Sequence, residues 1–219
     1  MVALMLTTDD VPGGDTLVAQ NNIVETTGCL QADYLLSIAL SHTPETDATT
    51  VVIDAGDVEV TQTLVLDMIE SEPNQRFHSI ASVISSCDGR TLEAPYWAMP
   101  SSPPTRSEAF TLTPSDQLPD GVTGYTSTVT AGDGAQRTFQ RIYVPVKDNQ
   151  GKTGLIALTT ATNGNQPATP TPLDLLDTAT QRANVTIDHA ALAVPYPEEP
   201  FYEPTTSQPS TEPTTTDQP

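Results

Sequence analysis

A strand followed by a helix, between Val58 and Cys87, is the feature that most constrains how this chain can fold. Apolar and β-branched residues crowd the stretch 58–69 with partial alternation, which is typical of a long, half-buried strand. The triplet 71–73, Ser-Glu-Pro, favours a helix start. An apolar helical face follows at steps of three or four residues: Phe77, Ile80, Ala81, Ile84 and Cys87. Asp88-Gly89 ends this helix. Because Cys87 belongs to the apolar face, its side chain is expected to point into the core.

The chain has two cysteines, Cys29 and Cys87, and neither stands in a CxxC or Cys/His spacing that zinc would need. If they form a disulfide, the bridge ties the middle of the domain to its beginning and stabilises the fold by about 4 kcal/mol through loop entropy. The alternative is a pair of buried free thiols in a cytosolic protein. The Thr/Pro-rich C-terminal end and the scarcity of lysine favour the disulfide and an oxidising compartment.

Length and charge set the domain count and exclude some partners. The 219 residues suffice for one domain with its own core, which we place at residues 1–194. Residues 195–219 are rich in proline, threonine and glutamate without a periodic apolar face, so they predict a disordered tail. A formal net charge of -20 argues against nucleic-acid or membrane binding through a basic patch.

Hydrophobic periodicity assigns the remaining elements. Strands are expected at 49–54, 106–114, 122–130, 138–146 and 153–159, and helices at 29–41 and 173–183. Residues 16–19 fit an edge strand or a loop, and the proline-rich stretch 92–104 fits a loop or an extended segment. The predicted fold class is α+β, an antiparallel β-sheet with two or three helices packed against it.

Neither an export signal nor a membrane-spanning segment is recognisable in this chain. The apolar start at residues 1–6 lacks a basic region and is too short for the apolar core of a signal peptide. No apolar run reaches the roughly 18 residues that a spanning helix needs. Because the Thr/Pro-rich end and the scarcity of lysine favour an oxidising compartment, we still expect an extracytoplasmic protein, either secreted or anchored to the membrane through a segment absent here.

The order of these features resembles that of a known family. It comprises an apolar start with the turn Asp10-Val11-Pro12-Gly13, an early cysteine, a long strand, a helix ending in Cys87, a hairpin around Gly151 and a closing helix at 173–183. Over roughly residues 4–190 the chain resembles the extracytoplasmic sensor-type domains of some mycobacterial receptor serine/threonine kinases and of related small actinobacterial lipoproteins.

This resemblance implies an antiparallel sheet backed by helices, a location beyond the cytoplasmic membrane, a cleft suspected of ligand binding and no catalytic residues. Those domains commonly carry two disulfides and a tryptophan shortly before the cysteine at the helix end. Here there are two cysteines only, and Val83-Ile84 stands in the place of the tryptophan. The chain contains no kinase segment.

Two groups of residues are candidates for binding. Tyr96, Trp97 and Met99 form an apolar cluster between prolines, of the kind that lines a cleft rim or a partner site; a loop packed as a lid over the sheet is the simpler alternative. Three carboxylates of Asp54, Asp57 and Glu59 surround one turn and offer the oxygen ligands that calcium uses. They lack the alternating spacing of a calcium loop, and a plain acidic hairpin turn is the alternative.

No motif pairs a nucleophile with a base. His42, His78 and His189 are isolated, and neither a GxSxG elbow nor an SxxK motif occurs. We therefore expect no enzyme, no catalytic residue and no cofactor, but a sensor-like domain of the cell envelope that binds a small molecule or an envelope protein or glycan. The first alternative is a structural or assembly factor of the envelope, and the second is a hydrolase.

Replacing Cys87 by serine tests the disulfide. In non-reducing buffer we expect the melting temperature of Cys87→Ser to fall below that of the wild type, because the unfolded chain regains the entropy that a cross-link removes. Circular dichroism measures the melt, and wild-type protein in reducing agent is the matched control. Identical melting curves for all three samples would mean that no disulfide is present.

Overall fold

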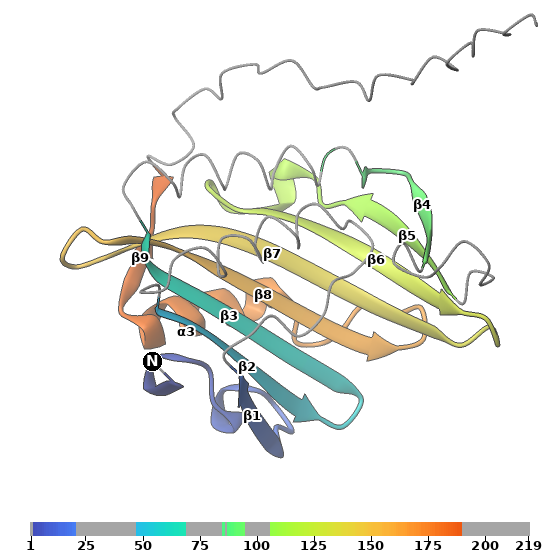
Figure 1. The fold of residues 1–219 in the computed structure, drawn as a ribbon, viewed down its shortest axis with the longest axis horizontal. Helices are drawn as coiled ribbons and strands as arrows, with labels where there is room; N and C mark the ends of the chain where they lie inside the picture. Colours follow the sequence, from blue (N-terminus) through green and yellow to red (C-terminus); the bar gives the residue numbers. More distant parts are fainter. Residues whose placement is uncertain (1, 21–46, 69–84, 86, 95–105, 190–219) are drawn as a thin grey trace, which may run out of the picture.

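The fold is built on one large antiparallel β-sheet (Figure 1). The computed structural model describes residues 2–20, 47–68, 85, 87–94 and 106–189. In this part of the chain the strand order is β1-β2-β3-β8-β7-β6-β5-β4, and β9 pairs with the end of β7. The strands are β1 (Thr16–Gln20), β2 (Asp47–Ala55), β3 (Val58–Met68), β4 (Thr91–Ala94), β5 (Arg106–Leu112), β6 (Thr123–Ala131), β7 (Gln136–Asp148), β8 (Thr153–Asn163) and β9 (Val185–Ile187). The predicted antiparallel sheet is confirmed.

Two long hairpins form the centre of the sheet. β2 and β3 join through a turn in which Gly56 has φ +74° and donates its N–H to Asp54 Oδ1 at 2.9 Å. β7 and β8 join through a turn in which Gly151 has φ +84°. Glycine adopts this left-handed conformation without the steric cost of a Cβ atom. The strands predicted around both turns are confirmed, and β7 and β8 extend beyond their predicted bounds.

Pro145 lies inside β7, although proline cannot donate a ladder hydrogen bond. β6 pairs with β7 as far as Tyr143, and β9 takes over from Val146. Pro145 therefore stands where β7 changes neighbour, and its carbonyl accepts the N–H of Asp188 at 2.9 Å. The backbone nitrogen of Pro145, which carries no hydrogen, faces the same side of β7 as its carbonyl. This side lies between the end of the pairing with β6 and the start of the pairing with β9, so no ladder hydrogen bond is lost and β7 remains continuous.

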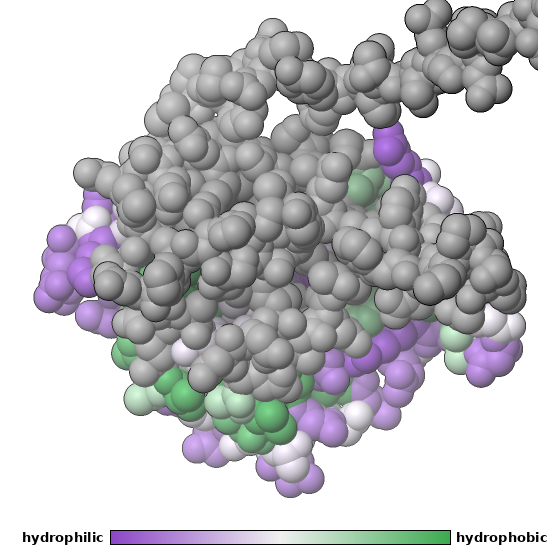
Figure 2. Space-filling model, in the orientation of Figure 1, coloured by the Kyte–Doolittle hydropathy of each residue, from purple (hydrophilic) through white to green (hydrophobic). Residues whose placement is uncertain are grey.

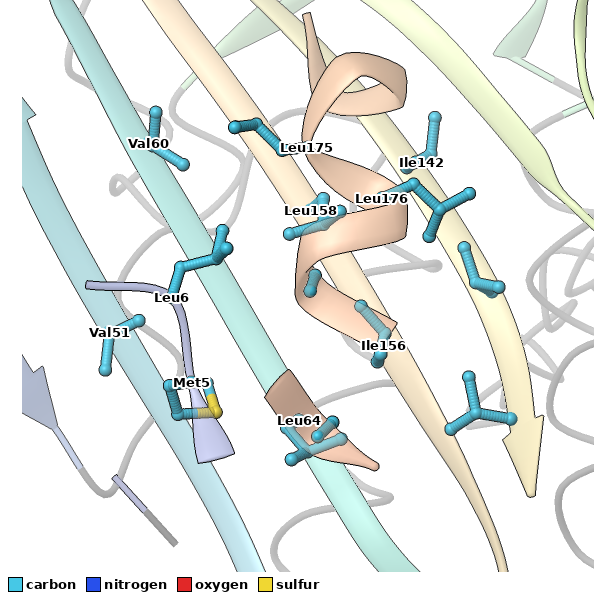
Figure 3. Packing of buried hydrophobic residues seen from close by; sticks show 14 of the residues in the cluster. Met5, Leu6, Val51, Val60, Leu64, Ile142, Ile156, Leu158, Leu175 and Leu176 are labelled. Carbon is cyan, nitrogen blue, oxygen red and sulfur yellow. The ribbon is translucent and has the colours of Figure 1, made fainter. Parts of the chain in front are cut away.

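The helix α3 (Pro172–Ala183) packs against one face of the sheet and confirms the predicted closing helix. Its first turn is capped reciprocally: Asp174 N–H donates to Thr171 Oγ1 at 3.2 Å, and Thr171 N–H donates to Asp174 Oδ2 at 2.8 Å. The core on this face, shown in part in Figure 3, consists of Met5, Leu6, Val11, Val51, Ile53, Val60, Leu64, Ile142, Val144, Val146, Ile156, Leu158, Leu175, Leu176, Ala179, Ala183 and Val185.

The N-terminal segment packs beside α3 on the same face. It contains two 3-10 turns, η1 (Val2–Leu4) and η2 (Thr8–Asp10), and Met5 and Leu6 between them are completely buried. The N–H of Leu6 donates to Gln62 Oε1 at 2.7 Å, which satisfies a backbone donor that lies in the core. The apolar start of the chain therefore belongs to the core.

Arg182 joins the end of α3 to this N-terminal segment. Its guanidinium donates to Asp10 Oδ1 at 2.8 Å and to Thr7 Oγ1 at 3.2 Å. Burial acts to raise the pKa of Asp10, but the hydrogen bonds from Arg182 and Thr7 and the charge of Arg182 outweigh it and hold this pKa below its ordinary value.

Other expectations are tested in part. Thr91–Ala94 forms β4 against β5, so the stretch 92–104 is extended at its start, while residues 95–105 lie outside the described residues. α3 is the one α-helix described over its full length, and the predicted helix at 29–41 lies outside the described part. The predicted tail at 195–219 lies outside it as well.

Only the end of the predicted central helix is described. Ser85 and Cys87 are helical and Gly89 has φ +67°, which confirms the helix end expected at Asp88-Gly89. Cys87 is buried, and no described cysteine is free. Cys29 lies outside the described residues, so its pairing with Cys87 stays a prediction.

The contact between Asp10 and Arg182 predicts a pH dependence of stability. Because the folded pKa of Asp10 is lowered from 3.8, the ionised carboxylate stabilises the fold above that value, and this contribution is lost as the pH falls through the folded pKa. We expect Asp10→Asn to be less stable than the wild type at neutral pH and the difference to shrink below about pH 4. Urea unfolding across this range measures it, with Asp9→Asn as the control. A difference that stayed constant into strong acid would contradict the assignment.

Candidate functional site

A pocket opens where the end of α3, the strand β9 and the turn between β7 and β8 meet. In Figure 1 these elements lie together at the left end of the sheet. The pocket has a volume of about 360 Å³, which lies within the range that holds small ligands. It is lined by Lys147, Asp148, Asn149, Thr180, Gln181, Asn184, Val185 and Thr186.

Asn184 brings the three elements together. It follows the last residue of α3 and has φ 54° and ψ 46°, a left-handed conformation that asparagine tolerates better than most residues. Its N–H donates to the Gln181 carbonyl at 3.1 Å, which closes the helix. The chain then reverses into β9, which pairs with the end of β7, and Thr186 Oγ1 donates to the Lys147 carbonyl at 3.4 Å. One wall of the pocket is thereby fixed by backbone pairing.

The opposite wall is the turn between β7 and β8, and Asp148 stabilises it. Asp148 Oδ1 accepts the N–H groups of Gln150 and Lys152, each at 2.8 Å. The Asp148 N–H in turn donates to the Lys152 carbonyl at 2.8 Å. The Asp148 carboxylate therefore holds the turn in shape, which leaves it less able to bind a ligand.

Four exposed side chains around the pocket remain available for hydrogen bonds. Lys147, Asn149, Gln181 and Asn184 make no side-chain hydrogen bond or ion pair within the described part of the chain. Their groups are one ammonium and three primary amides, which supply donors and acceptors without a fixed negative charge. Among the described lining residues Val185, which is 8% exposed, is the one apolar side chain. Such a lining suits a ligand with hydroxyl or carboxylate groups.

A second feature is a band of charged and aromatic side chains on the sheet face opposite α3. Glu108 is 4% exposed and accepts a hydrogen bond from Ser127 Oγ. The guanidinium carbons of Arg137 and Arg141 lie 5.0 and 5.9 Å from the ring centroid of Phe139, within the distance of a cation–π contact. Two charged residues, Glu108 and Arg141, are buried on this face.

The sequence candidates lie elsewhere. Tyr96, Trp97 and Met99 lie outside the described residues. Asp54 and Glu59 face each other across β2 and β3, as the proposed carboxylate group requires. However, Asp54 accepts the Gly56 N–H, and Glu59 forms an ion pair with Arg137 at 2.9 Å. Within the described residues no group of three or more histidine, cysteine, aspartate or glutamate side chains is placed to hold a metal ion.

Sequence reasoning missed the pocket residues. From the sequence we expected only a hairpin around Gly151 and only a helix at residues 173–183. The available signal was an amide residue directly after the helix, Asn184, followed by a strand pattern at 185–187. That signal predicts a sharp reversal, but the position of the β7–β8 turn beside it depends on the register of β9 against β7.

Comparisons with known proteins bear on the fold. No family model and no curated protein matches the chain. Among solved structures, the extracellular domain of PknH from Mycobacterium tuberculosis is similar, with a TM-score of 0.55 and 10% sequence identity over 82% of this chain and 94% of that chain. The resemblance predicted from the sequence is thus confirmed at the level of the fold. None of the helices in the described residues is long and apolar enough to cross a membrane.

Proposed function

We propose that this chain is a non-catalytic, extracytoplasmic, sensor-like domain that binds a small polar ligand in the pocket at the end of α3. The observation that carries the proposal is a set of four side chains, Lys147, Asn149, Gln181 and Asn184, that have no side-chain partner among the described residues and surround a volume of about 360 Å³. A ligand pocket needs a few polar groups that fix its ligand, and these four converge from three different elements.

The chemistry of the lining narrows the class of ligand. Stacking of an aromatic ligand is not favoured, because the described residues that line the pocket include no aromatic side chain. Amides pair well with hydroxyl groups, since each amide both donates and accepts, and the Lys147 ammonium pairs with a carboxylate. A small sugar or sugar acid, such as a fragment of an envelope glycan, satisfies these groups best.

Two further observations support the compartment. The net charge of -20 suits a protein in solution outside the cell, and the described Cys87 is not a free thiol. The solved structure with a similar fold is the extracellular domain of PknH. The alternative of an assembly factor calls for a broad exposed apolar patch. In the described residues, only Val2 and Val18 are exposed large hydrophobic side chains, so the observations favour ligand binding.

Nuclear magnetic resonance titration tests the site with glucose, N-acetylglucosamine and glucuronate as probes. We expect the largest shift changes at the backbone amides of Asn149, Gln181 and Thr186. Gln181→Ala should weaken binding roughly fivefold, the effect of one lost hydrogen bond of about 1 kcal/mol. Gln150→Ala is the matched control, because it truncates the same type of side chain in the β7–β8 turn beside the pocket but outside its lining.

Lys147→Gln separates the two ligand classes. It should weaken glucuronate binding more than glucose binding, because only the acid gains from the ammonium charge. Shift changes that map to the face carrying Glu108 and Arg141 would move the site to that face. Binding that is insensitive to both pocket variants would contradict the proposal.

A further inference from the structure

We propose that the outer edge of β1 accepts an extended, positively charged segment of a protein partner as an additional strand. β1 is the last strand at one end of the sheet, and within the described residues no strand pairs with its outer side. A strand in that position presents backbone N–H and C=O groups that an extended peptide can pair with. This inference is independent of the pocket at the end of α3.

The two edges of the sheet differ in how they are protected. β4, at the other end, contains Glu93 and is flanked by Arg90, and charged residues are a common protection of edge strands. β1, with the sequence Thr-Leu-Val-Ala-Gln, contains no charged residue, no proline and no glycine. It pairs with β2 without a register shift from Thr16 to Gln20, so its backbone has the regular extended conformation that an added strand can pair with.

Val18 lies at the centre of this edge and is 51% exposed. It stands opposite Val52 of β2, which is half-buried, so the two valines form a small apolar surface beside the open edge. Figure 2 shows a hydrophobic area in this lower part of the molecule, where Figure 1 places β1 and β2, bordered by hydrophilic surface. Alternate side chains of an added strand would lie against this area.

Charge selects the kind of partner. Asp15 directly precedes β1, and Asp54 and Asp57 lie at the adjoining end of the β2–β3 hairpin; all three are exposed. None of them forms an ion pair within the described part of the chain. A strand with lysine or arginine at this end gains attraction, whereas a second copy of this chain, with its net charge of -20, is repelled.

A short synthetic peptide of alternating valine and lysine is the probe, and its binding is followed by fluorescence anisotropy. Two matched peptides are needed: one with glutamate in place of lysine, and one of the same charge with proline in place of valine, which cannot form a strand. We expect the valine–lysine peptide to bind, and both others to bind at least about tenfold more weakly.

Two protein variants locate the contact. Val18→Lys should weaken binding of the valine–lysine peptide about tenfold, because it places a positive charge on β1 that repels the lysines of the peptide. Val2→Lys makes the same change of charge at the other exposed valine, which is 47% exposed and lies outside the sheet, so its affinity should stay close to that of the wild type.

Four results would overturn the proposal. Equal binding of the proline peptide, or equal losses in both lysine variants, would reduce the effect to general attraction between opposite charges. Equal binding of the glutamate peptide would remove the charge preference. Sedimentation of the chain alone as a dimer that Val18→Lys dissociates would assign the edge to a second copy instead.

Discussion

The packing of α3 and the N-terminal segment onto the central strands is the interaction on which the remaining structure depends. Leu175 and Leu176 are 4% and 3% exposed, and each contributes roughly 1.5–3 kcal/mol by leaving water. The ion pair between Arg182 and Asp10 contributes less, about 1 kcal/mol or below, because Arg182 is partly exposed. Apolar burial therefore holds α3 in place, and the ion pair adds orientation. The pocket at the end of α3 inherits its position from this packing.

Features that depend on local chemistry could be predicted from the sequence. The turns at Gly56 and Gly151 need a left-handed residue, and the Thr171-Pro172 start of α3 carries its own cap. Features that depend on the register between strands could not be predicted in this way. Glu59 belongs to an acidic turn in the sequence, yet it pairs with Arg137, which lies on a strand far along the chain. The pocket is of the second kind, since its walls meet only through the pairing of β9 with β7.

Three of the few basic residues have a role that the described part of the chain shows. The chain has 8 lysine and arginine residues against 28 acidic ones. Arg182 and Arg137 are used for tertiary contacts with Asp10 and Glu59, while Lys147 remains at the pocket without an ion-pair partner in the described residues. An uncommitted ammonium in so acidic a chain is a specific attractor for an anionic group. The acid excess elsewhere keeps such a ligand from binding non-specifically.

The core that stabilises the sheet also keeps the pocket at the end of α3 in its observed conformation. Native-state hydrogen exchange measures this directly, since an amide exchanges only when its hydrogen bond opens. The Asn184 N–H, bonded to Gln181, and the Asp188 N–H, bonded to Pro145, are the reporters beside the pocket. The account predicts that they are protected nearly as strongly as the amides of β3, β7 and β8. Exchange at these two sites that is orders of magnitude faster than in the central strands would contradict it.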